Sequence, residues 1–148
     1  MSVNANVSHG HRPQSAAPFM NKRNVPVVAD FDVAAGGSNV CEVTISFQDG
    51  AGATVAEPLL FDVWLSDAAT GAGKTGTTAS GTVTAKSASG VVWTTEESKK
   101  ALKVQALATG LFVLEITDSA KTAFRVCVQN PVTGQVHVSD ALVTANYG

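Results

Sequence analysis

The sequence predicts an all-β protein, an antiparallel sandwich of about seven to nine short strands preceded by an extended N-terminal arm. The main observation is alternation. Residues 40–48 place Cys41, Val43, Ile45 and Phe47 on one face and polar residues on the other, because successive strand side chains point to opposite faces. Comparable stretches recur at intervals of about 8–12 residues between turns rich in Gly, Asn, Asp and Pro, which is typical of sandwiches.

Composition supports one domain with an appendage. The 148 residues are 45% hydrophobic and 15% charged, which is enough apolar material for a core. Abundant apolar residues and a net charge of only -2 argue against disorder of the whole chain. We therefore expect an arm at residues 1–24, rich in Asn, Ser, His and Pro, and a β-sandwich domain at residues 25–148.

Charge is unevenly distributed along the chain. The first 29 residues contain Arg12, Lys22 and Arg23 and no acid, so the remainder carries seven bases against twelve acids, a net charge of -5. A basic arm on an acidic body favours docking onto an acidic neighbour, including another copy of the same protein. Three cations give only a weak and salt-sensitive contact with nucleic acid, so no specific nucleic-acid partner is expected.

The arm has two interpretations. It is either a frayed terminus or a segment that orders on a partner, with Phe19 and Met20 as the anchor beside Lys22 and Arg23. The chain has no apolar stretch of the ~18–20 residues that cross a bilayer. Its first 18 residues also lack the apolar region of a secretory signal. We therefore expect synthesis in a cytosol without Sec export and no membrane partner.

Turn residues divide the body into its expected strands. The loop at 68–80 is so rich in Gly, Thr and Ala that we expect it to need a neighbour to become ordered. Residues 95–100 fit a charged loop better than a helical turn. The expected strands are 25–34, 40–48, 57–67, 81–86, 91–95, 101–107, 111–117, 122–129, 135–138 and 141–146.

The two cysteines are predicted to be free thiols. Cys41 shares its face with Val43, Ile45 and Phe47. Cys127 lies on the face opposite Val126 and its apolar neighbours, so it points away from a core built on them. Alternation therefore argues against a disulfide between two sheets, and free thiols agree with a reducing compartment.

The sequence motifs that suggest chemistry are weak. Residues 71–75 read GAGKT, but a phosphate loop needs a glycine where Ala68 stands and a helix after it. His9 and His11 lack further ligands nearby, so a solvated pair explains them better than a metal site. Asp30 and Asp32 share one strand face and fit a solvated surface better than calcium binding or acid–base chemistry. We expect no catalytic residue, metal or cofactor, and no enzyme activity.

Three stretches of the body have a distinctive wording. They read FDVWLSDAATG at 61–71, ATGLFVLEITD at 108–118 and VSDALVT at 138–144. Together they resemble small immunoglobulin-like virion proteins of tailed bacteriophages. The resemblance covers roughly residues 38–148 and excludes the arm. It implies an immunoglobulin-like sandwich with the role of a head decoration or minor capsid protein, a non-enzymatic structural component of the virion.

The resemblance also implies partners. Such proteins bind the outside of the shell, often as oligomers, so we expect contacts with the major capsid protein and with further copies of this chain. The protein would then be made in the bacterial host cytoplasm and end on the capsid surface. Trp64, on the mixed face of its strand, is either an interface residue or an ordinary half-buried aromatic. The partner-binding candidates are Arg12, Phe19, Lys22, Arg23, Trp64 and Trp93.

Two other locations stay open. A structural protein of the tail or neck is the closest alternative, since those proteins are also rich in strands. The other is an adhesion module on the tail or fibre that binds host-surface glycans, with the polar loop 68–80 and Trp93 as a stacking surface.

Overall fold

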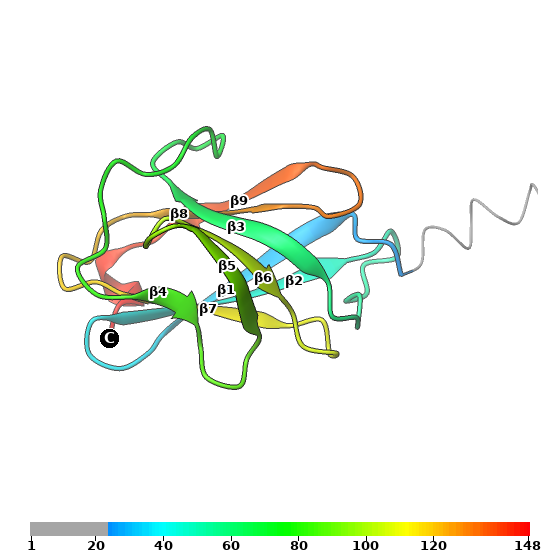
Figure 1. The fold of residues 1–148 in the computed structure, drawn as a ribbon, viewed down its shortest axis with the longest axis horizontal. Coiled ribbons are helices and arrows are strands. Elements are labelled where there is room, and N and C mark those ends of the chain that lie inside the picture. The colour runs from blue at the N-terminus through cyan, green and yellow to red at the C-terminus, as the bar shows by residue number, and fades with distance from the viewer. Residues whose placement is uncertain (1–23) are drawn as a thin grey trace, which may run out of the picture.

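Two antiparallel sheets pack face to face in the computed structural model, which describes residues 24–148 (Figure 1). One sheet has the order β1-β2-β7-β4, and the other has the order β5-β6-β3-β8-β9. The prediction of an all-β fold is confirmed, since the described part contains no helix except the short 3-10 turn η1 (Thr144–Asn146). The strands are β1 (Val28–Ala35), β2 (Val40–Gln48), β3 (Leu60–Ser66), β4 (Val83–Ala85), β5 (Val91–Glu97), β6 (Ala101–Gln105), β7 (Phe112–Thr117), β8 (Arg125–Gln129) and β9 (Val136–Ala141).

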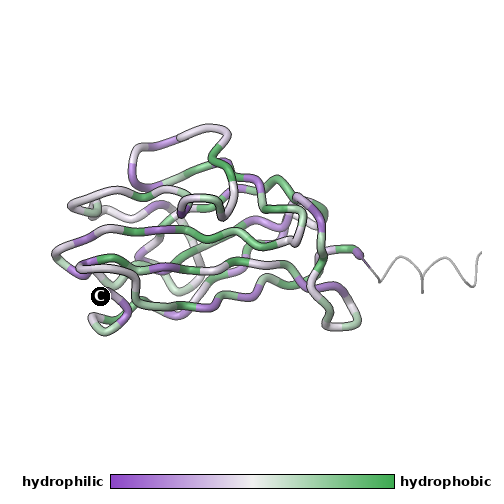
Figure 2. The backbone as a smooth tube through the Cα atoms, turned by 90° about the horizontal axis from the view of Figure 1, so that it is seen from below, coloured by the Kyte–Doolittle hydropathy of each residue, from purple (hydrophilic) through white to green (hydrophobic). Residues whose placement is uncertain are grey.

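The core lies between the inner faces of the two sheets. The alternation predicted for 40–48 is confirmed, because β2 has these bounds and its four inward side chains are at most 1% exposed. Aromatic rings join the sheets: Phe61 of β3 meets Phe47 and Phe112 edge to face at centroid distances of 5.2 and 5.9 Å. Hydrophobic and hydrophilic positions alternate along the backbone in the same way (Figure 2).

The C-terminal segment differs from expectation. Residues 141–146 do not form a separate strand; β9 runs from 136 to 141 and η1 follows it. Local and long-range hydrogen bonds explain the change. The Val143 amide donates to Asn146 Oδ1 at 2.7 Å, and the buried Tyr147 hydroxyl donates to the Thr122 carbonyl at 2.6 Å. The aromatic residue is thus fixed in the interior by a bond that strand alternation does not reveal.

A buried carboxylate shortens another expected strand. The segment predicted at 122–129 begins pairing only at Arg125, because the preceding residues form a turn around Asp118. The amides of Ser80, Ala120 and Thr122 donate to this carboxylate at 2.9–3.2 Å. Burial acts to raise the pKa of Asp118, but these hydrogen bonds outweigh burial and lower it to about 2.

The expected charged loop at 95–100 is shorter than predicted. Strand β5 continues to Glu97, and residues 98–100 alone make the turn into β6, with Lys99 at φ 61°. The register of β5 against β6 shifts twice, once between Val92 and Thr94 and again between Thr95 and Glu97. Such bulges re-aim side chains and are common on edge strands.

Both cysteines are free thiols, as predicted, and both are buried. Cys41 belongs to the core between the sheets, whereas Cys127 faces outward on β8. Cys127 is nevertheless completely buried, because the 68–80 loop crosses that outer face near Gly71. Burial is also the main reason that the pKa of each thiol is raised to about 11.

Candidate functional site

Exposed apolar side chains gather at one end of the sandwich. This end contains the first residues of β1, β3, β5, β7 and β9, and the chain enters it from residue 24 (Figure 1). Of ten exposed large hydrophobic residues in the described part, nine lie here and only Val143 lies at the other end. We call this surface the apolar end; its members are Val27, Val28, Leu60, Val91, Trp93, Leu107, Leu111, Val132 and Val136.

An open hollow of about 460 Å³ lies on the outer face of the five-stranded sheet at this end. Strands β3, β6 and β8 supply its floor through Leu60, Asp62, Lys103 and Gln129. The turn at 130–134 forms its wall. The hollow therefore combines an apolar rim with polar groups that can donate and accept hydrogen bonds.

An ion pair crosses the floor of the hollow. Lys103 Nζ lies 3.0 Å from Asp62 Oδ1, and the two residues are directly opposite each other on β6 and β3. The hydrogen bond and the charge of Asp62 raise the pKa of Lys103, so this amine stays protonated at neutral pH. A protonated amine held by a carboxylate can bind polar groups but is a poor nucleophile or base.

Trp93 lies beside the hollow with a fixed indole. Its side chain is 62% exposed, and its Nε1 donates to Gln105 Oε1 at 2.7 Å. The Gln105 amide in turn donates to the Pro58 carbonyl at 3.4 Å. Trp93, Gln105 and Leu60 line a second hollow of about 290 Å³. The bulge that contains Trp93 and this hydrogen bond give the ring a defined orientation on the surface.

Trp64 has a different environment. It lies half-buried on β3, and its Nε1 donates to the Gly71 carbonyl at 3.1 Å, which places it under the 68–80 loop. Along β6, Trp64 lies opposite Ala101, whereas the hydrogen bond of Trp93 is to Gln105, four residues further on. The structure therefore does not bring the two tryptophans together.

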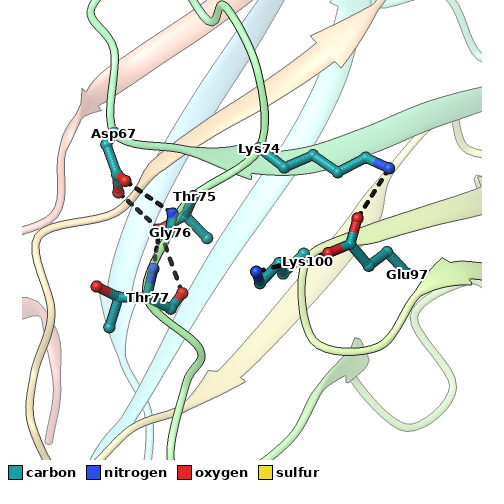
Figure 3. A network of polar contacts seen from close by, with 7 residues as sticks. All are labelled: Asp67, Lys74, Thr75, Gly76, Thr77, Glu97 and Lys100. Atoms are coloured by element: carbon teal, nitrogen blue, oxygen red, sulfur yellow. Dashed lines mark hydrogen bonds and ion pairs between the residues drawn. The ribbon is translucent and has the colours of Figure 1, made fainter.

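The 68–80 loop is ordered by the rest of the chain. At its base Thr75 Oγ1 donates to Asp67 Oδ1 at 2.6 Å and the Gly76 amide donates to Asp67 Oδ2 at 2.9 Å (Figure 3). These bonds lower the pKa of Asp67. Lys74 reaches Glu97 of β5 at 3.0 Å. The neighbour that the sequence led us to expect is thus the protein's own body.

The 68–80 loop and Trp93, the two parts of the expected glycan surface, have different neighbours in the structure. The 68–80 loop contacts Trp64, Cys127 and Val138 and the Glu97 end of β5. Trp93 instead shares its surroundings with Leu60 and Gln105 near the beginning of that strand. No local sequence pattern indicates that Leu60, Asp62, Lys103 and the 130–134 turn share one hollow.

The other sequence motifs find structural explanations. Thr75 of the GAGKT stretch bonds Asp67, and no helix follows it in the described chain. Asp30 and Asp32 are exposed on the outer face of β1. No group of three or more His, Cys, Asp or Glu within residues 24–148 is arranged to hold a metal ion.

Several candidates lie outside the described residues. These are the histidines of the arm and four of the six partner-binding candidates, namely His9, His11, Arg12, Phe19, Lys22 and Arg23.

Comparisons with known proteins identify no relative. Neither a protein-family model, nor a curated protein, nor a solved structure matches this chain. Within residues 24–148, no helix is long and apolar enough to span a membrane.

Proposed function

We propose that this protein is a non-enzymatic structural component of a tailed-bacteriophage virion. In this proposal it is a head decoration or minor capsid protein that binds the capsid exterior through its arm and its sandwich. The observation that carries the proposal is the position of the phage-like stretches. FDVWLSDAATG covers β3 except its first residue, Leu60, and ATGLFVLEITD covers β7. Each strand lies inside its own sheet with neighbours on both sides.

The strand order supports an immunoglobulin-like architecture. In an immunoglobulin sandwich, strands A, B, E and D form one sheet and C, F and G form the other. Here β1-β2-β7-β4 occupies the positions of A, B, E and D, and β3-β8-β9 occupies those of C, F and G. The β5–β6 hairpin adds two strands beside β3, although in sequence it follows the strand at position D. The free thiols and the outward Trp64 depart from the antibody pattern.

Buried polar groups support a structural role. Asp118 holds three backbone amides, and the nearly buried Asn130 binds the Pro26 carbonyl and the amides of its own turn. Ser139 Oγ accepts from the Val126 amide at 2.9 Å and fills the irregular pairing of β8 with β9. These groups fix turns and sheet edges, which is what a protein selected for a rigid shape requires.

Cryo-electron microscopy of intact particles from the phage that encodes this chain tests the proposal. We expect density for the two-sheet body on the shell surface, with residues 1–24 against the capsid or a neighbouring copy. Density at the tail or neck would replace the capsid assignment with the alternative location. Absence from purified particles would overturn the virion proposal.

A charge reversal tests the role of the arm. Lys22→Glu with Arg23→Glu should reduce the occupancy of the protein on particles, since the acidic body of a neighbour attracts a basic arm. Lys74→Glu with Lys86→Glu is the matched control. It changes the net charge equally and breaks ion pairs made by partly exposed lysines, which contribute little to stability in water. Equal occupancy for both double variants and the wild type would exclude a role for the basic pair.

An adhesion module is a second candidate, and Trp93 is the observation that favours it. An exposed indole that is hydrogen-bonded to Gln105 and lies beside Leu60 is a suitable surface for stacking a sugar ring. Density at a tail tip or fibre, combined with glycan binding that Trp93→Ala abolishes, would support this candidate over the capsid assignment.

A further inference from the structure

Three residues of the apolar end line the two hollows. Leu60 lines both of them, and it therefore connects Trp93 on one side with Val132 on the other. These three side chains are 45–62% exposed. Monomeric proteins seldom expose contiguous apolar surface without a use for it. We call these three residues the Trp93–Leu60–Val132 band.

The chain enters the body at the edge of this band. The Pro26 carbonyl accepts a hydrogen bond of 2.8 Å from the Asn130 side chain, which is 1% exposed. Asn130 is also part of the hollow wall, next to Val132. Two residues earlier, the Asn24 amide donates to Asp49 Oδ2 at 3.2 Å. The described chain therefore begins two residues before a contact with the wall of the larger hollow.

The residues directly before this point contain the apolar pair of the arm. Met20 and Phe19 stand four and five positions before Asn24, so they reach at most about 14 and 17 Å from it. A tether this short gives an effective concentration in the millimolar range. Phenylalanine offers a large apolar surface and methionine adapts to irregular gaps. In sequence, the basic Lys22 and Arg23 separate this apolar pair from Asn24, whose amide is bonded to the Asp49 carboxylate.

We propose that Phe19 and Met20 of the same chain dock on the Trp93–Leu60–Val132 band in the free protein. Docking covers this band and links the arm to the body without a partner. The inference concerns the isolated chain and does not rest on the virion proposal. Its failure is visible in solution, whereas failure of the virion proposal is visible only on particles.

Nuclear magnetic resonance of the full chain tests the docking. We expect nuclear Overhauser effects between the Phe19 ring and the methyl groups of Leu60 and Val132. In the variant Phe19→Ser with Met20→Ser these effects are lost, and the Leu60, Val132 and Trp93 resonances shift. Val143 is an internal control because it is equally exposed at the opposite end. The reciprocal variant changes the band instead of the arm. Leu60→Ser, at a position that is 45% exposed, should abolish the nuclear Overhauser effects between the Phe19 ring and the band.

A second variant separates docking from a general effect of the arm. Val3→Ser with Val7→Ser makes the same kind of change much further from Asn24, and it should leave the Leu60 and Val132 resonances unchanged. A mixture of labelled and unlabelled chains then distinguishes contacts within a chain from contacts between chains. Overhauser effects found only between different chains would overturn the same-chain proposal. Unshifted Leu60, Val132 and Trp93 resonances in Phe19→Ser with Met20→Ser would also overturn it.

Discussion

Asp118 provides a sharp test of what holds one end of the sandwich together. Its carboxylate is fully buried and accepts the amides of Ser80, Ala120 and Thr122, so it joins the segment before β4 to the turn after β7. We predict that Asp118→Asn destabilises the protein at neutral pH. The amide keeps one oxygen for Ser80 and Ala120, but it turns an NH₂ group toward the Thr122 amide, which is itself a donor.

The magnitude follows from two contributions. Hydrogen bonding lowers the pKa of Asp118 from 3.8 to about 2, which corresponds to roughly 2.4 kcal/mol at pH 7 if solvent screens none of it. Because exposed Ser119 and Ala120 flank the carboxylate, we reduce this contribution to about 1–2 kcal/mol. The mismatched Thr122 amide adds about 1 kcal/mol. We therefore expect Asp118→Asn to lower the free energy of unfolding by about 2–3 kcal/mol at pH 7.

The stabilisation by Asp118 should decrease as the pH falls. Because the pKa is lowered in the folded state, the ionised carboxylate stabilises the protein above its unfolded pKa of 3.8. This contribution disappears as the pH falls toward about 2. Urea unfolding at pH 7 and near pH 2, followed by circular dichroism, should show the difference between wild type and Asp118→Asn shrinking in acid.

The exposed Asp140 supplies the control. Asp140→Asn should change stability by less than about 0.5 kcal/mol at both pH values. If Asp118→Asn lost the same free energy at pH 7 and at pH 2, the argument from ionisation would be refuted. If it lost nothing at pH 7, the carboxylate would not hold the turn at all.

Three further predictions concern the loop, the thiols and the exposed indole. Gly71→Ala should cost about 1–3 kcal/mol in thermal unfolding, because φ is +76° and the new Cβ would lie 2.8 Å from Val138 Cγ2; an unchanged midpoint would contradict this. Cys41 and Cys127 should resist maleimide at pH 8 until urea unfolds the protein, since burial raises both pKa values to about 11; labelling of the folded protein at the rate of a free thiol would disprove it. Trp93→Ala should alter the free energy of unfolding by about 1 kcal/mol or less, because the ring is 62% exposed; a much larger loss in denaturant titration would assign the ring to the core.

The sequence was sufficient to predict most of the fold. Alternation in 40–48 identified the inward face of β2, and the same argument placed Cys127 outside the core between the sheets. It did not predict that Cys127 is nevertheless buried, because the cover comes from Gly71, more than fifty residues away in the chain. The predicted ends of some strands were wrong for a related reason. Asp118 and Tyr147 fix turns through hydrogen bonds to distant residues, and no local pattern encodes such bonds.

The candidate site was less accessible to sequence reasoning. Trp93 was one of the partner-binding candidates, and its side chain is exposed. Its neighbours come from β3 and β6, which begin tens of residues apart in the chain. The larger hollow additionally needs the 130–134 turn. A site assembled from three strands and a turn becomes visible only once the pairing of those strands is known.

The pairing of β2 with β7 has a consequence for how quickly the chain folds. Ile45 lies opposite Phe112, although 67 positions separate them in the sequence (112 minus 45). The entropy of closing so long a loop must be overcome before this pairing contributes any stability. Hairpin β5–β6, with its turn of three residues, has no such barrier and can form within microseconds. We therefore expect a topology-limited folding time of milliseconds to seconds, set by the meeting of β2 with β7 after the local hairpins have formed.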